Sequence, residues 1–227
     1  MINDQKQEKS FSFRNHCLRA YRLFILSVST YMYFCYFRRF GWSTFNAIFS
    51  YLTQWGNLVN HTYFLLNTIM FVDKKPTKRF SIFFNLVLAM NITVSLLFYG
   101  VLYPHLPADF FDEFNDVEFS PFLKASTYLM YYTHTIPVIA SLIDFYFNRI
   151  ELDGKGFKAW LGVMICYLTV NAVNALVFKN IIYHIITYTD IMSYVIIAGA
   201  IVFAFFTWKI PLYLQRYKLK TKANKLE

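Results

Sequence analysis

A threonine and a histidine in two apolar segments could act as the nucleophile and the base of a hydrolase. Thr53 lies within FNAIFSYLTQWGNLVNHTYFLLNTIMFV (45–72), and His134 lies between two threonines in YYTHTIPV (131–138). A threonine hydroxyl is a weak nucleophile until a neighbouring imidazole takes its proton during attack on a carbonyl carbon. Threonine and histidine occur on separate helices of many membrane proteins, so these two residues indicate a catalytic pair only if the topology brings them to the same depth in the membrane.

Further polar side chains share one helical face with Thr53. Thr53, Asn57, Asn60 and His61 fall at i, i+4, i+7 and i+8. Asn57, and Asn171 from a later apolar segment, could donate hydrogen bonds to an oxyanion. We expect Asn57, Asn60, His61 and Asn171 to line a polar cavity beside the pair. The alternative is that these groups only join helices, as Asn, Thr and His commonly do in membranes.

The composition predicts an all-α polytopic membrane protein with a single domain, residues 1–227. Of the 227 residues 57% are hydrophobic and 15% are charged, and glycine and proline are scarce. Apolar runs of about 20 residues recur, each long enough to cross a hydrocarbon core about 30 Å thick. We expect a bundle of about six transmembrane helices at 20–37, 45–72, 80–103, 122–147, 157–178 and 191–214.

The basic residues predict the orientation of this bundle. All but four of the 22 Lys and Arg residues fall in or beside the N-terminal tail, the 73–79 and 148–158 loops and the C-terminal tail. The positive-inside rule therefore places both termini in the cytosol or in a mitochondrial matrix. The net charge of +9 follows from this topology. We expect no nucleic-acid partner, because no basic run is interleaved with exposed aromatic residues.

The topology places the candidate pair at similar depths in the membrane. Both spans start on the outer side, and at 1.5 Å per residue Thr53 lies about 12 Å and His134 about 18 Å into its span. A tilt, or a kink at Pro137, could close this difference. Pro137 also removes the usual backbone hydrogen bond to the carbonyl of Thr133. We expect Thr53 and His134 to meet in the outer half of the bundle, in a cavity reachable from lipid.

The remaining ionisable groups and cysteines predict no further chemistry. Asp144 lies near the inner end of its span and is expected to pair with Arg149, because a lone carboxylate deeper in the membrane would cost about 2.5–3.5 kcal/mol. The cysteines, three in number, are far apart and form no metal-binding pattern. We therefore expect neither a metal site nor a cofactor.

Two blocks of the sequence carry a family resemblance. In FGWSTFNAIFSYLTQWGNLVNHTYF (40–64) a glycine and a tryptophan precede Tyr51-Leu52-Thr53, and VLYPHLPADFF (101–111) is followed by YYTHTIPVIASLID (131–144). These segments resemble the androgen-induced, FAR-17a-like family of integral-membrane threonine hydrolases. In that family the threonine and the histidine of these motifs hydrolyse fatty acid esters of hydroxy fatty acids. The resemblance implies six spans and a catalytic role for Thr53 and His134.

The chain departs from that family in a longer, acidic outer loop at 104–121. A run of charges usually marks a solvated loop, and the alternatives are a lid over the cavity or a docking surface for a basic partner. The substrate preference of the family does not transfer across such a change.

Two functions are therefore open. The first is a membrane lipid esterase in which Thr53 attacks a long-chain fatty acid ester and His134 is the base. The alternative is a non-catalytic accessory subunit of a large membrane complex, for example in the mitochondrial inner membrane of a protist. Such a subunit would contact its partners through the 104–121 loop and both tails, and the 26 Phe and 18 Tyr would suit protein contacts.

The location is expected to be an integral position in a membrane, with membrane lipids as neighbours. The sequence does not distinguish the mitochondrial inner membrane from the endoplasmic reticulum or the plasma membrane. A transporter or channel is disfavoured, because the acidic residues lie mainly in loops and not along the spans.

Overall fold

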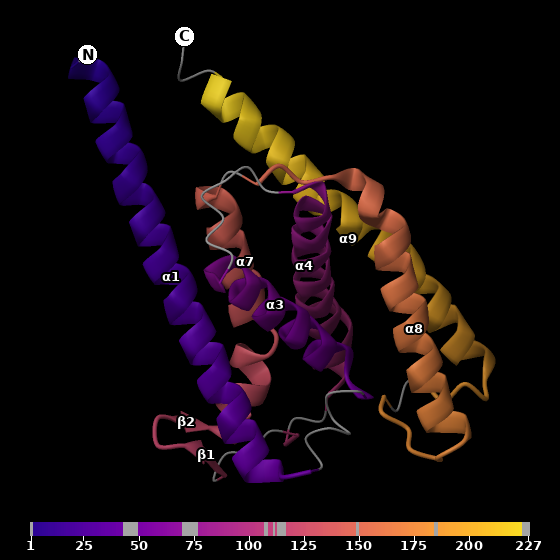
Figure 1. The fold of residues 1–227 in the computed structure, drawn as a ribbon. Coiled ribbons are helices and arrows are strands. Elements are labelled where there is room, and N and C mark those ends of the chain that lie inside the picture. Colours follow the sequence, from indigo (N-terminus) through magenta and orange to yellow (C-terminus); the bar gives the residue numbers. More distant parts are fainter. Residues whose placement is uncertain are drawn as a thin grey trace.

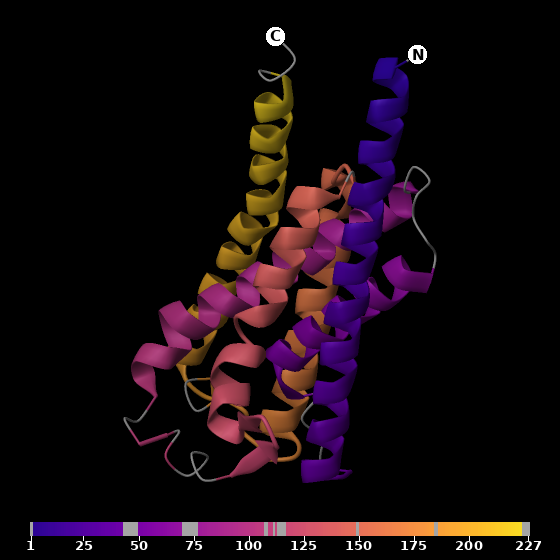
Figure 2. The same ribbon diagram turned by 90° about the vertical axis from the view of Figure 1, so that its left-hand side faces the viewer.

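Long helices run alternately in opposite directions in a computed structural model of the chain (Figure 1). Helix α1 (Ile2–Phe40) begins at the end of the molecule at which α9 (Ile191–Ala223) ends, as Figure 2 also shows. Which side of a membrane this end faces remains a prediction from charge. The structure describes residues 2–42, 50–69, 77–106, 109–110, 112, 117–148, 150–183 and 186–223, and their side chains from residue 13 to residue 221.

Helix α4 (Lys78–Leu97) is the central helix, because α3, α7 and α9 all pack against it. In Figure 1 it lies between α1, α3 and α7 on one side and α8 and α9 on the other. The hydroxyl of Thr77 caps its first turn by accepting a hydrogen bond from the Phe80 backbone N–H at 3.3 Å. The helix continues through a π-helical turn, η1 (Phe98–Leu102), and a 3-10 turn, η2 (Tyr103–His105).

Helix α3 (Leu52–Ile69) packs between α1 and α4 and carries Thr53 in its first turn. Its buried face is unusually polar for an apolar segment, because four of its buried side chains are amides. The buried aromatic residues are Tyr63 and Phe64, and the buried amides are Gln54, Asn57, Asn60 and Asn67.

The segment expected to be one span at 122–147 is broken, and this expectation is wrong in detail. It contains a short helix α6 (Ala125–Thr127), a π-helical turn η3 (Tyr128–Tyr132), a turn at 133–135, and then α7 (Ile136–Phe147). Pro137 lies in the first turn of α7, where a missing backbone N–H costs no helical hydrogen bond. The proline therefore begins a helix and does not kink one.

The acidic outer loop is described only in part, since Glu113 and Asp116 lie outside the described residues. Near its end β1 (Glu118–Ser120) pairs antiparallel with β2 (Leu123–Lys124), so the chain is not entirely α-helical. Phe119 of β1 stacks on Tyr128 with ring centroids 4.0 Å apart. This contact holds the hairpin against the start of η3. Whether the loop acts as a lid or as a docking surface remains a prediction.

Helix α8 (Phe157–Leu176) follows a 3-10 turn, η4 (Gly154–Gly156), and pairs with α9 at the side of the bundle. A Cβ atom on Gly156 would lie 2.5 Å from Ile82 Cγ2, so only glycine allows this turn to approach α4 so closely. Most of the apolar surface of α8 and α9 faces outward. Of the most apolar stretch of each helix, 28% is buried in α8 and 22% in α9, whereas 67% is buried in the helix that begins with α4. These two helices are therefore suited to contact lipid or another protein.

Three helices of the described chain are long and apolar enough to cross a membrane, namely Lys78–His105, Gly154–Leu176 and Ile191–Thr221. They agree with the spans expected at 80–103, 157–178 and 191–214. The other three expected spans fall on α1, on the polar helix α3 and on the broken segment before and within α7. The structure is thus consistent with a membrane protein, and the bundle of six spans remains a proposal.

Gly56 lets α3 approach α4 closely, because a Cβ atom there would lie 3.3 Å from Val94 Cγ2. We expect Gly56→Val to push the two helices apart and to cost about 1–3 kcal/mol of stability. The measurement is thermal unfolding of the purified chain in detergent. Gly162→Ala is the matched control, since no atom lies within 4 Å of its added Cβ, and it should leave stability unchanged or raise it by about 1 kcal/mol. Equal effects of both changes would contradict the close approach.

Candidate active site

Thr53 and His134 lie in contact, one in the first turn of α3 and the other in the turn before α7. Thr53 Oγ1 is 3.1 Å from His134 Nε2. Both side chains are partly buried. A hydroxyl and an imidazole nitrogen at this distance are within reach for proton transfer.

The tautomer of His134 can be assigned from its other nitrogen. Nδ1 is 2.8 Å from the Leu129 carbonyl oxygen, which can only accept a hydrogen bond. Nδ1 therefore carries the hydrogen of the neutral ring, and Nε2 accepts from the Thr53 hydroxyl. The Thr133 hydroxyl donates to the same carbonyl at 2.6 Å and lies 2.9 Å from Nδ1. The neutral ring is thus oriented as a base toward Thr53.

The end of the π-helical turn explains this arrangement. In η3 the Thr133 N–H bonds to the carbonyl of Tyr128, five residues earlier, at 3.2 Å. The helix stops there, and the next carbonyl, that of Leu129, accepts from the histidine side chain. A π-helical turn beside a functional group is a recurrent feature of proteins.

One face of α4 and η1 holds the segment around His134 in place. The Ser95 hydroxyl donates to the His134 carbonyl, and the Tyr99 hydroxyl donates to the Met130 carbonyl at 3.2 Å. The Phe98 ring stacks on the imidazole, with centroids 3.5 Å apart and planes 9° apart. A cationic ring over an aromatic face is stabilised, so Phe98 would favour the imidazolium that forms during proton transfer. No sequence signal marks these residues, because serine and aromatic residues at this spacing are common in apolar helices.

A buried amide joins the two halves of the site. Asn91 on α4 donates to Asn60 Oδ1 on α3 at 2.9 Å, and it lies 3.3 Å from both the Pro137 carbonyl and Ser141 Oγ. It is 3% exposed. Because α3 carries Thr53 and Pro137 follows His134 closely, this amide positions the two reacting side chains relative to each other.

No family model, curated protein or solved structure matches the chain. The family resemblance of the two motifs therefore remains an expectation.

The other polar residues that we expected in the cavity take different positions. Asn57 and Asn60 line a small cavity between α1, α3, η3 and α7. His61 Nδ1 instead lies 2.8 Å from Ser29 Oγ on α1. Asn171 on α8 accepts from the Tyr188 hydroxyl at 2.9 Å, and it is not among the residues that line this cavity. Asn57 is therefore the better placed of the two expected oxyanion donors.

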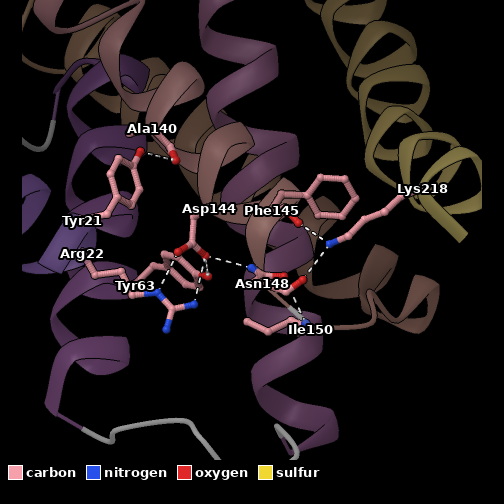
Figure 3. A network of polar contacts seen from close by, with 9 residues as sticks. All are labelled: Tyr21, Arg22, Tyr63, Ala140, Asp144, Phe145, Asn148, Ile150 and Lys218. Carbon is pink, nitrogen blue, oxygen red and sulfur yellow. Dashed lines mark hydrogen bonds and ion pairs between the residues drawn. The ribbon is translucent and has the colours of Figure 1, made fainter. Parts of the chain in front are cut away.

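Asp144 is fully buried, and it forms an ion pair with Arg22 of α1 (Figure 3). Arg22 Nε donates to one carboxylate oxygen at 2.7 Å, and the Tyr63 hydroxyl donates to the other at 2.5 Å. Asn148 Nδ2 adds a third donor at 2.8 Å. Arg149 lies outside the described residues. The carboxylate thus joins α1, α3 and α7 near the end of the bundle at which the chain begins.

Helix α9 is attached to the same network. Figure 3 shows Lys218 reaching from α9 toward the end of α7, where its ammonium donates to the carbonyl oxygens of Phe145 and Asn148, the latter at 2.8 Å. The Tyr21 hydroxyl of α1 donates to the Ala140 carbonyl at 2.9 Å. Helices α1, α3 and α9 therefore meet at the C-terminal half of α7, the helix that begins just after His134.

The described part of the chain holds no group of three or more His, Cys, Asp and Glu side chains that could bind a metal ion. The cysteines at positions 17, 35 and 166 are free, and Cys35 is buried.

Proposed function

We propose that the chain is an integral-membrane ester hydrolase in which Thr53 is the nucleophile and His134 is the general base. The observation that carries the proposal is the contact of Thr53 Oγ1 with His134 Nε2 at 3.1 Å, while His134 Nδ1 is held by the Leu129 carbonyl. A nucleophile, a base within hydrogen-bond reach and a third group that orients the base make up the pattern of activated nucleophiles.

The reaction would proceed in two halves. Thr53 Oγ attacks the ester carbonyl carbon while its proton moves to His134 Nε2, and the carbon–oxygen bond to the alcohol then breaks. His134 returns the proton to the leaving alkoxide, so that an alcohol departs and an acyl-threonine remains. Water then attacks the acyl group and gives a proton to His134. Thr53 leaves with that proton, and a carboxylic acid is released.

We propose a long-chain fatty acid ester as the substrate. The chain has three helices suited to a membrane, and an acyl chain dissolved in the bilayer could approach the bundle from its apolar surroundings. The resemblance of the two motifs to threonine hydrolases of membrane lipids favours the same class of substrate.

The test of the base is replacement of His134. We expect His134→Ala to lower kcat/KM for long-chain ester hydrolysis by about 10²–10⁴, the usual contribution of a general base. The measurement is hydrolysis of a panel of long-chain fatty acid esters by purified chain in detergent, together with labelling of Thr53 by a fluorophosphonate probe. His105→Ala is the matched control, because His105 is exposed in η2, and this variant should retain full activity.

Hydrolysis that is equal in the wild type and in the His134→Ala variant would contradict the proposal. If the wild-type chain neither hydrolyses any ester nor reacts with the probe, the alternative function is favoured, namely a non-catalytic subunit of a membrane complex. The outward-facing apolar side chains of α8 and α9 would then add to the contact surface expected from the 104–121 loop and both tails.

A further inference from the structure

A small cavity between α1, α3, η3 and α7 is lined by close sequence neighbours of Thr53 and His134, although neither of these two residues lines it. Its volume of about 20 Å³ is enough for about one water molecule. Asn57, one helical turn after Thr53, lines it from α3, and Tyr33 lines it from α1. Tyr132 and Pro137, which lie on either side of His134 in the sequence, also line it.

Two hydrogen-bond donors on this wall are buried without a partner among the described residues. They are the Asn57 side-chain amide nitrogen and the Tyr33 hydroxyl. Asn57 is only 8% exposed. A buried polar group without a hydrogen bond costs about 1–3 kcal/mol, so groups left in this state in a native fold usually have a ligand or a bound water.

We propose that this cavity is a binding site for one oxygen atom with free lone pairs, held by the Asn57 amide N–H and the Tyr33 O–H. In the resting protein that atom belongs to a water molecule. In the proposed hydrolase it is the carbonyl oxygen of the ester, which becomes an oxyanion when Thr53 attacks. Only this second identity rests on the proposed function.

The chemistry of the two donors supports an oxygen ligand. An amide nitrogen can only donate, and a phenol hydroxyl donates well to a negatively charged oxygen. Fixed hydrogen-bond donors that line one small cavity are the kind of group from which oxyanion holes are built. Two other residues of the cavity wall fix the helices that carry these donors. Asn60 of α3 accepts a hydrogen bond from Asn91 of α4, and Ser29 of α1 is hydrogen-bonded to His61 of α3.

A stability measurement tests the site without any enzyme activity. If an oxygen atom is bound, Tyr33→Phe and Asn57→Leu each remove one of its hydrogen bonds, and Tm of the full chain should fall by about 2–4 °C. If the cavity is dry, each change removes an unpaired buried polar group, so that Tm should rise or stay the same. An unchanged or higher Tm in both variants overturns the proposal. Tyr31→Phe is the matched control, because Tyr31 is an exposed residue of the same helix.

A kinetic measurement then identifies the oxygen. If it is the ester carbonyl, Asn57→Leu and Tyr33→Phe should each lower kcat by about 10²–10³ with little change in KM. A fall in Tm with unchanged kcat in an active chain would overturn the oxyanion assignment and leave a site for water. If wild type has no hydrolytic activity, the proposed function fails, while the Tm result still decides whether the cavity binds an oxygen atom.

Discussion

Replacement of Thr53 by alanine is expected to abolish ester hydrolysis, with a fall in kcat of about 10³–10⁶. The reason is that the acyl group must transfer to the Thr53 hydroxyl, which lies 3.1 Å from His134 Nε2. Thr53→Ser keeps a hydroxyl at the same position and should retain measurable activity. The measurements are ester hydrolysis and covalent labelling by a fluorophosphonate, with the modified residue found by mass spectrometry.

Thr62→Ala is the matched control for Thr53→Ala. Thr62 is another threonine of α3, and its hydroxyl donates only to the Leu58 carbonyl of its own helix, at 2.8 Å. Its removal should change neither hydrolysis nor labelling. Full hydrolysis by the purified Thr53→Ala variant would exclude Thr53 as the nucleophile, whatever the role of His134.

Disruption of the Asp144–Arg22 pair should give the largest loss of stability. Asp144→Leu leaves Arg22 buried without its carboxylate, and Arg22→Met leaves the fully buried Asp144 without its cation. Removal of one partner of a buried ion pair typically costs about 3–5 kcal/mol, because an uncompensated charge remains. The double variant Arg22→Met/Asp144→Leu buries no such charge and should be more stable than either single variant.

Thermal unfolding of the four proteins in one detergent measures this double-mutant cycle. Lys78→Met is a suitable control, because Lys78 lies 4.0 Å from Asp153 with its side chain 65% exposed, and such a surface pair contributes about 0–1 kcal/mol. Additive losses in the double variant would show that Arg22 and Asp144 stabilise the fold independently.

The sequence predicts the approach of Thr53 to His134 from their similar depths in two apolar segments, and the contact forms although His134 lies in a turn and not inside a continuous helix. A constant rise per residue gives such depths only for regular helices, and the segment before His134 contains a strand, a π-helical turn and a turn as well. The polar stripe of α3 was likewise readable, since helical periodicity places Asn57 and Asn60 on the face of Thr53. Those two amides do line one cavity, although His61 and Asn171 turn to other partners.

The break before α7 was not predictable in the same way. The sequence 122–147 is apolar enough to read as one span, and Pro137 is compatible either with a kink or with a first helical turn. The choice depends on α4 and η1, where the hydroxyls of Ser95 and Tyr99 donate to the irregular backbone around His134. Only packing of one segment against another supplies those donors.

The sequence by itself determined that the chain is mostly helical and apolar enough for a membrane, and which helix face carries the polar groups. Composition and the periodicity of 3.6 residues are local properties, and they can be read along the chain. The tertiary structure alone decided that Asp144 pairs with Arg22, 122 residues away, and that Phe98 covers the imidazole of His134. Such contacts depend on which helices are neighbours and on how each helix is rotated about its axis. The same helical sequences are compatible with several packing arrangements, so the sequence does not specify the neighbours or the rotations.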